Sequence, residues 1–135
     1  MKHNLTMLIG RAIAASRAAY APYSKFRVGA LLVGKDGTLY SGCNVENAAY
    51  PATICGERTA LVKAISEGAR EFDTIVIATK NGGSPCGTCR QMLNEFAPTM
   101  QVICVTFEGE VTINAPLNEL LPYGFGPGDL KPPTE

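Results

Sequence analysis

The N-terminal segment has a pattern of apolar and polar positions typical of an amphipathic helix. Apolar side chains recur with the spacing of one helical face: Leu5, Leu8, Ile9, Ala12 and Ile13. Asn4 precedes them and is a favourable N-cap. Proline disfavours helical backbone in the residue before it and lacks an amide hydrogen, so the helix should end before Ala21-Pro22.

Apolar and β-branched runs predict strands further along the chain. The first two, 26–33 and 38–45, are joined by Gly34-Lys35-Asp36-Gly37, a sequence suited to a hairpin turn. Three more runs predict strands over 74–79, 101–107 and 111–114, with a turn between the last two. Helical patterns over 55–68 and 86–96, and a short one over 117–121, separate or follow them.

This order of elements indicates the fold class. Strands that alternate with helices favour parallel pairing, whereas the two short turns require antiparallel pairs. We therefore predict an α/β fold with a five-stranded mixed sheet flanked by helices. Residues 1–135 should form a single domain, with a loosely ordered Gly/Pro-rich tail from about 124.

Composition and charge narrow the class of protein. Hydrophobic residues make up 46% of the 135 residues and charged residues 18%, which excludes intrinsic disorder. The formal net charge is zero, so the chain has no basic excess for binding nucleic acid, and it has little charge repulsion against self-association. It has no apolar run of about 20 residues and no secretory signal, so we expect a cytoplasmic protein without a membrane partner.

The chain has five cysteines, and in a reducing compartment they are expected to be free thiols or metal ligands. Cys86 and Cys89 have the CxxC spacing at the start of a predicted helix, where both sulfurs can approach one cation. This pair fits a redox dithiol, half of a structural zinc site or part of a catalytic one. Cys43 and Cys104 lie in apolar strand patterns that favour core packing.

Cys55 is the better third ligand, because it also stands just before a predicted helix. Three cysteines leave one zinc position open for water, as in catalytic sites. Glu57 is the candidate acid and base, although residues two apart diverge by about 200° on a helix, so Cys55 must be a non-helical cap. Arg58 is either a solvated surface charge or a donor to the ligand sulfurs.

These motifs resemble those of the zinc-dependent nucleoside deaminases. Cys55-Gly56-Glu57 and Pro85-Cys86-Gly87-Thr88-Cys89 match the zinc signature, and Glu57-Arg58-Thr59-Ala60 and Cys89-Arg90-Gln91 extend the match. Together with the segments 20–30 and 42–48, they are similar to the small homotetrameric cytidine deaminases. The resemblance implies a three-layer fold, one Zn²⁺ per subunit, and hydrolysis of cytidine and 2′-deoxycytidine to the uridine nucleosides and ammonia in pyrimidine salvage.

The resemblance also implies roles for several other residues. Asn44 and Glu46 alternate on a predicted strand and would hold the ribose 3′-hydroxyl, which favours a free nucleoside over a polynucleotide. Phe26 would pack against the pyrimidine, and the Gly56 amide would bind the base carbonyl. Ala48, Tyr50 and Phe125 would complete the pocket of a neighbouring subunit, because each pocket would be shared within a homotetramer.

Two residues depart from the family pattern and bear on substrate range. Gly56 stands where alanine is more usual, and Pro51 stands in the loop before Cys55. An alternative function is deamination of another cytosine-like nucleoside, such as an aminopyrimidine antibiotic. A non-catalytic structural-zinc module is the other alternative, and it requires a fourth ligand such as Cys43 or Cys104.

Overall fold

The computed structural model describes residues 3–130, and its five strands form one mixed sheet in the order β2-β1-β3-β4-β5. The strands are β1 (Gly29–Gly34), β2 (Leu39–Cys43), β3 (Phe72–Thr79), β4 (Gln101–Thr106) and β5 (Val111–Pro116). Strands β3 and β4 are parallel, and the other neighbours are antiparallel. The predicted mixed pairing is therefore confirmed.

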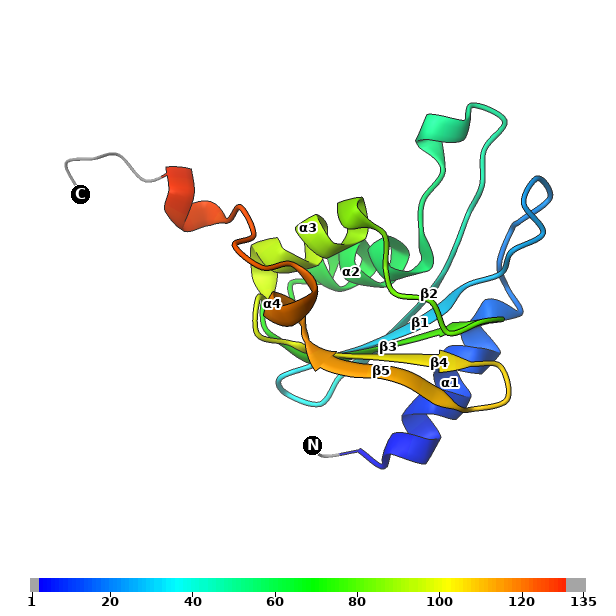
Figure 1. The fold of residues 1–135 in the computed structure, drawn as a ribbon, viewed down its shortest axis with the longest axis horizontal. Coiled ribbons are helices and arrows are strands. Elements are labelled where there is room, and N and C mark those ends of the chain that lie inside the picture. The colour runs from blue at the N-terminus through cyan, green and yellow to red at the C-terminus, as the bar shows by residue number, and fades with distance from the viewer. Residues whose placement is uncertain (1–2, 131–135) are drawn as a thin grey trace.

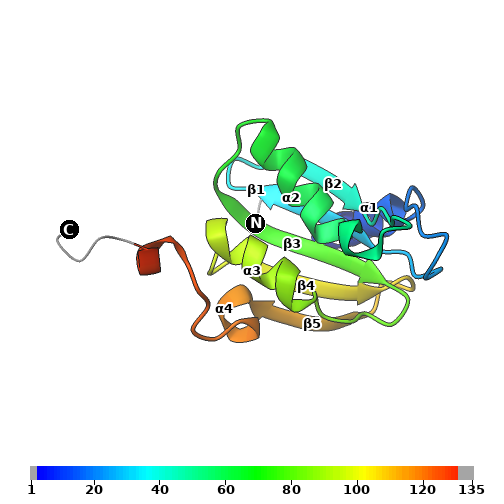
Figure 2. The ribbon, with the colours of Figure 1, turned by 90° about the horizontal axis from the view of Figure 1, so that it is seen from above.

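Helices cover both faces of this sheet and give three layers (Figures 1 and 2). Helix α1 (Leu5–Ser16) lies on one face, and α2 (Gly56–Ser66), α3 (Gly87–Phe96) and α4 (Leu117–Leu120) lie on the other. The Asn4 side chain accepts a hydrogen bond from the Met7 amide, so the predicted N-cap of α1 is confirmed. Two short 3-10 helices, Tyr50–Ala52 and Pro127–Leu130, were not predicted. Across residues 3–130, none of the helices combines the length and apolar character needed to cross a membrane.

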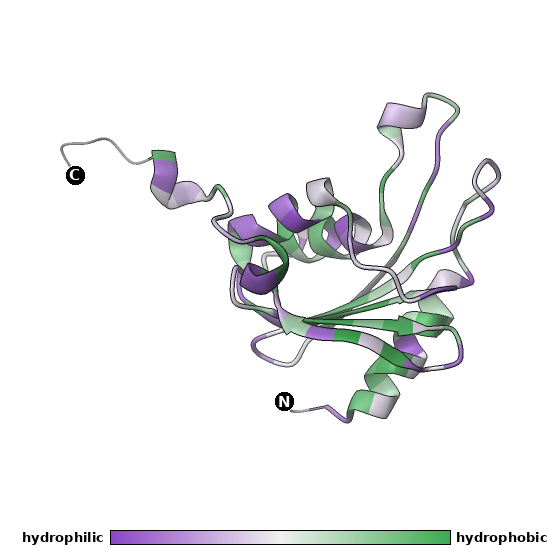
Figure 3. Ribbon diagram, in the orientation of Figure 1, coloured by the Kyte–Doolittle hydropathy of each residue, from purple (hydrophilic) through white to green (hydrophobic). Residues whose placement is uncertain are grey.

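Alternating side chains of the central strands build two hydrophobic cores. Leu32, Ile75 and Ile77 pack towards α2 and α3, whereas Leu31 and Val76 pack towards α1. All these side chains are buried, which explains why the central strands are coloured as hydrophobic along most of their length in Figure 3. The burial of both faces makes the central sheet a firm platform for the helices above it.

Two glycines let the helices approach the sheet closely. A Cβ atom on Gly42 would lie 2.4 Å from the backbone nitrogen of Ala60 in α2, and one on Gly29 would lie 2.0 Å from the carbonyl oxygen of Ala12 in α1. No side chain fits at such distances, so only glycine is compatible with the close contact at positions 29 of β1 and 42 of β2. This close contact fixes the position of α2 and its N-terminus over the sheet.

The structure corrects the ends of the first hairpin. Strand β1 begins at Gly29 rather than at residue 26, and β2 ends at Cys43 rather than at residue 45. The Asn44 side chain accepts a hydrogen bond from the Val28 amide (2.9 Å) and donates one to the Phe26 carbonyl (2.8 Å), so it takes over the pairing that a longer strand would make. The chain beyond the ladder, residues 17–28 and 44–55, forms two arms that project past the sheet (Figure 1).

The segment after α4 makes hydrogen bonds to α3 and within itself. The Phe125 carbonyl accepts hydrogen bonds from Gln91 (2.5 Å) and Asn94 (3.1 Å) of α3, and the Gly126 amide donates to Asp129 (2.8 Å). Residues 131–135 of the predicted tail lie outside the described part of the chain. The first residues of this segment are therefore held against the helical layer.

Candidate metal centre and active site

Two helix N-termini bring the predicted thiols together. Cys55 is the N-cap of α2 and Cys86 is the N-cap of α3, and both have extended backbone. Cys89 follows in the first turn of α3 and is buried. Cys55 is therefore a non-helical cap, which is the position that lets its sulfur and the Glu57 side chain face the same site. Because helix N-termini carry partial positive charge, they favour thiolates at this point.

The three sulfurs have the spacing of a zinc site. Two ligands about 2.3 Å from a tetrahedral zinc ion lie about 3.8 Å apart. The sulfurs of Cys86 and Cys89 are 3.4 Å apart, those of Cys55 and Cys86 are 4.0 Å apart, and all three lie within 4.8 Å of one another. Thiolates suit Zn²⁺, so both the geometry and the donor chemistry fit this metal.

No fourth protein ligand joins this group among residues 3–130. Neither Cys43 nor Cys104 belongs to the cluster, although both are described. Cys104 is instead part of the core beneath α2 and α3, where burial raises the pKa of its thiol to about 12. A closed four-ligand structural site, as the binding-module alternative requires, is therefore not formed by these residues.

Arg58 lies beside the sulfurs, as one of its two sequence interpretations expected. Its Nη2 atom donates to the Cys55 sulfur (3.6 Å) and to the Thr53 carbonyl (3.1 Å), and its buried Nε atom has no hydrogen-bond partner. A hydrogen bond from the Cys89 thiol, together with Arg58, lowers the pKa of Cys55 to about 5. Three thiolates holding one Zn²⁺ would carry a net charge of −1, which this guanidinium would balance.

Glu57 is buried within the first turn of α2, with 5% of its surface exposed. Burial disfavours its charged form and, together with the nearby Cys55 thiolate, raises its pKa to about 7. Its side chain lines the same cavity as Cys55 and Cys86. A carboxyl group with this pKa can both accept and return a proton near neutral pH.

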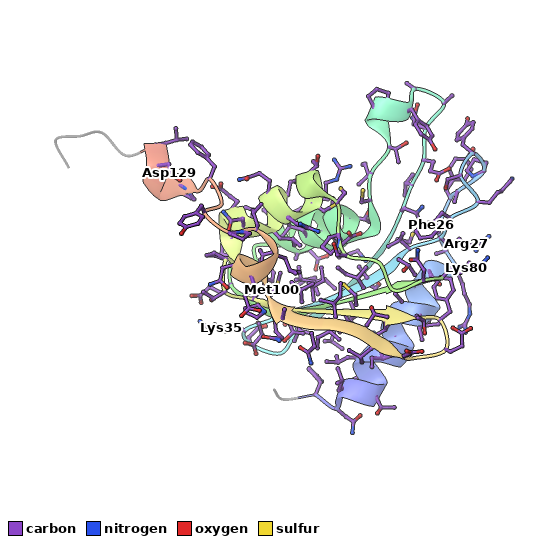
Figure 4. The ribbon with its side chains drawn as sticks, viewed as in Figure 1. Phe26, Arg27, Lys35, Lys80, Met100 and Asp129 are labelled. Carbon is purple, nitrogen blue, oxygen red and sulfur yellow. The ribbon has the colours of Figure 1, made fainter. Side chains whose placement is uncertain are left out.

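The cavity beside the sulfurs has a volume of about 290 Å³, near the lower end of the roughly 300–1,000 Å³ range of small-molecule sites. It contains six of the residues predicted from sequence: Phe26, Asn44, Glu46, Cys55, Glu57 and Cys86. Phe26, which Figure 4 labels at the foot of one arm, forms part of its apolar wall. The predicted residues thus come from both arms and both helix N-termini.

Asn44 and Glu46 lie beyond β2, not on it, but both remain on one side of the chain and line the cavity. Each is 6% exposed, so neither side chain lies on a solvated surface. Glu46 accepts hydrogen bonds from the amides of Tyr23 and Ser24 (3.0 Å each) and from the Ser24 hydroxyl. The Ser24 hydroxyl is the main reason that the pKa of Glu46 is lowered.

The structure does not bring Ala48, Tyr50 or Phe125 into this cavity. All three are exposed, with Ala48 and Tyr50 on one arm and Phe125 in the segment after α4. The Tyr50 ring meets Tyr23 of the other arm edge to face, with a centroid distance of 6.5 Å. Their assignment to a neighbouring subunit's pocket stays a prediction.

The two departures from the family pattern have local explanations. Gly56 is buried, and a Cβ atom there would lie 3.1 Å from a methyl group of Val28, so this site leaves little room for alanine. Pro51 lies exposed within the 3-10 helix of one arm, four residues before Cys55, where its fixed backbone suits the turn.

Sequence reasoning missed several residues that line the cavity: Ser24, Thr53, Thr79 and Ser84. Thr79 ends β3, and its hydroxyl accepts hydrogen bonds from the amides of Gly82 (2.8 Å) and Gly83 (3.2 Å). A threonine before an Asn-Gly-Gly turn is a signal for such a hydroxyl-capped loop. The other three carried no comparable signal, because their roles depend on tertiary contacts.

A three-thiol group at two helix N-termini, with a buried carboxyl group beside it, defines the class of zinc-dependent deaminases. Residues 2–106 match the family model described as the cytidine and deoxycytidylate deaminase zinc-binding region. The chain therefore belongs to the cytidine and deoxycytidylate deaminase family, as its sequence motifs indicated.

Relatives and solved structures agree with this assignment. The chain is 44% identical over 126 residues to a cytidine deaminase of Sporosarcina psychrophila, covering 91% of this chain and 92% of that protein. It is 45% identical over 127 residues to one of Halalkalibacterium halodurans, covering 92% and 96%. The crystal structure of cytidine deaminase from Burkholderia pseudomallei, 44% identical, matches with a TM-score of 0.87 over 91% of this chain and 100% of that chain.

Proposed function

We propose that this chain hydrolyses cytidine and 2′-deoxycytidine to uridine and 2′-deoxyuridine, with release of ammonia. The observation that carries the proposal is the burial of Glu57 in the same cavity as the thiols of Cys55 and Cys86. Those two thiols and that of Cys89 would hold one Zn²⁺. Membership of the deaminase family and relatives named cytidine deaminase support this activity.

The reaction replaces the amino group on C4 of the pyrimidine with oxygen from water. Zn²⁺ in such a site supplies Lewis-acid chemistry, which makes water acidic enough to be a nucleophile near neutral pH. Glu57 takes a proton from the attacking water as the C4–O bond forms, and passes it to N3. Glu57 then takes the second proton of that water from the new hydroxyl group on C4 and gives it to the amine as the C4–N bond breaks. Ammonia leaves, and Glu57 is ionised again.

The groups around Glu57 orient the base. Phe26 packs against the pyrimidine from the cavity wall. Gly56 is the first residue of α2, and its amide is among the helix N-terminal donors that lack an intrahelical acceptor, so it suits the base carbonyl. Arg58, which does not line the cavity, stabilises the Cys55 thiolate with a hydrogen bond.

The remaining hydrogen-bonding capacity of Glu46 fits one hydroxyl group. A carboxylate offers about four acceptor positions, and the Tyr23 and Ser24 groups use three of them. The lowered pKa keeps Glu46 ionised, so the last position accepts a donor such as the ribose 3′-hydroxyl. A phosphate ester at that oxygen has no donor and adds negative charge, so a free nucleoside is the preferred substrate.

The exposed aromatic residues support a homotetramer with shared pockets. Tyr50 and Phe125 are 59% and 55% exposed, and both lie outside the cavity of their own subunit. Burying such side chains against another copy removes apolar surface from water. All five cysteines are free thiols, which suits a cytoplasmic enzyme of pyrimidine salvage.

The test is to incubate zinc-loaded protein with cytidine and measure ammonia and the ultraviolet change. Glu57→Gln should retain zinc and lose about 10²–10⁴-fold in turnover. Glu67→Gln, at the exposed C-terminal end of the same helix, is the matched control and should keep the parent rate. Near-normal turnover by Glu57→Gln would contradict the role of this carboxyl group.

Parallel assays define the substrate class. Cytidine 3′-phosphate should react far more slowly than cytidine, because Glu46 then faces a phosphate. An aminopyrimidine nucleoside antibiotic should also be a poorer substrate than cytidine. Faster ammonia release from the antibiotic would replace the proposed substrate with the alternative one while keeping the same chemistry.

A further inference from the structure

We infer that Arg90 is a positioning residue that holds Cys86 within reach of Cys55 and Cys89 by clamping the loop before α3 to the end of α4. This inference rests on the proposed metal site. Arg90 touches neither the cavity nor a sulfur atom, so its contribution is made through the backbone.

Every nitrogen of the Arg90 guanidinium has a partner on another part of the chain. Nε donates to the Pro85 carbonyl (2.8 Å), Nη1 donates to the Leu120 carbonyl (2.8 Å), and Nη2 donates to the Ser84 hydroxyl. The fork geometry of arginine allows three acceptors to be held at fixed relative positions. A lysine at this position has one nitrogen and cannot join the same three groups.

Of the three thiols, that of Cys86 depends most on its loop. Cys89 is buried within α3, and the Cys55 sulfur accepts a hydrogen bond from Arg58. Cys86 is exposed, is preceded by a loop, and makes no side-chain capping hydrogen bond. The peptide unit between Pro85 and Cys86 is planar, so the bond from Arg90 to the Pro85 carbonyl fixes the plane from which the Cys86 side chain projects.

The other end of the clamp is the last turn of α4. The Leu120 carbonyl is one of the helix C-terminal acceptors, which lack intrahelical donors and favour a cationic partner. Leu117 of this short helix is fully buried in the main core, so α4 is a firm anchor for the loop. Through Arg90, the loop that carries the exposed Cys86 thiol is therefore hydrogen-bonded to a helix that packs in the core.

The position of Arg90 within α3 also supports a positioning role. It lies near the N-terminus of α3, where the helix dipole opposes a positive charge. The helix dipole therefore does not account for an arginine there, whereas three hydrogen bonds to the loop and to α4 do.

The experiment measures zinc release from the loaded protein to a chromogenic chelator. Loss of a group that orients a metal ligand typically costs about 10–100-fold in metal affinity, so Arg90→Met should release zinc about 10–100-fold faster than the parent. Arg90→Lys should lie between the two. Arg70→Met is the matched control, because Arg70 also donates to two backbone carbonyls, at the exposed end of α2, and it should release zinc at the parent rate.

Cobalt substitution gives a second readout that a general loss of stability does not move. The thiolate-to-cobalt charge-transfer absorption depends on the number of bound thiolates, so at limiting Co²⁺ it should fall in Arg90→Met and stay unchanged in Arg70→Met. If Arg90→Met does not fold, Arg90→Gln, which is too short to span the same groups, replaces it with the same expected direction.

Parent-like zinc release and a parent-like cobalt spectrum in Arg90→Met or its substitute would overturn the inference. The parent protein separates this result from the proposed function. If the parent retains zinc but releases no ammonia from cytidine, the proposed function fails. The comparison of zinc release between the Arg90 variants and the parent still tests the inference.

Discussion

Replacing Glu57 with glutamine should stabilise the metal-free protein at alkaline pH, although it removes the proposed proton carrier. The pKa of Glu57 is raised from its ordinary value of 4.5 to about 7, mainly by burial. Between these two values, the unfolded chain has an ionised Glu57 while the folded chain keeps it protonated. The folded state binds more protons, so the free energy of unfolding falls as the pH rises through this window.

The size of the effect follows from the two pKa values. At pH 8, ionisation of the buried carboxyl group lowers the free energy of unfolding by about 3 kcal/mol, and most of this loss develops between pH 5 and pH 8. Glutamine has a similar shape and does not titrate. The stability of Glu57→Gln relative to the parent should therefore rise by about 2–3 kcal/mol over that interval.

Urea unfolding with a chelator and a thiol reductant measures this difference at fixed protein concentration. The comparison between variant and parent cancels the groups that both share, and Glu67→Gln controls for the loss of one exposed carboxylate. Zinc should reduce the difference, because its positive charge favours ionised Glu57. A stability difference that is the same at pH 5 and pH 8 would refute the reasoning that burial governs this carboxyl group.

Four further substitutions test other parts of the structure. Cys86→Ser should lose zinc and Cys104→Ser should retain it, as measured by atomic absorption, because Cys104 stands outside the three-sulfur group. Asn44→Ala should lower the free energy of unfolding by about 1–3 kcal/mol, since it leaves two backbone groups without partners, and denaturant unfolding measures it. Gly42→Ala should cost at least about 1–3 kcal/mol by the same method, because its Cβ would lie 2.4 Å from the Ala60 nitrogen.

The sequence predicted the parts of the site that depend on local periodicity. The CxxC spacing and the cap position of Cys55 follow from helix geometry, and the order of strands and helices follows from hydrophobic runs and turns. The side chain of Asn44 was harder to place, because an alternating pattern continues past the point where β2 ends. Its hydrogen bonds to residues 26 and 28 end the ladder, and no local pattern encodes such a contact.

Contacts between distant segments account for the rest of what the sequence did not predict. Glu46 resembles a free substrate ligand in the sequence, but three of its acceptor positions hold the other arm through Tyr23 and Ser24. Arg90 belongs to a motif that matches the family, but the sequence does not indicate its partners, one of which lies 30 positions away. Both roles depend on which segments the sheet brings together, so they emerge only from the tertiary structure.

The chemical and recognition parts of the site have different structural supports. The thiols and Glu57 are carried by helix N-termini that pack on a sheet buried on both faces. Asn44 and Glu46 instead belong to the arms, which pair with each other through backbone and side-chain hydrogen bonds and few buried apolar groups. Substitutions at arm residues that line the cavity but lie outside the three-thiol group, such as Asn44 and Glu46, therefore alter the recognition surface without removing a metal ligand. Substrate range can therefore vary within this fold without loss of the deamination chemistry.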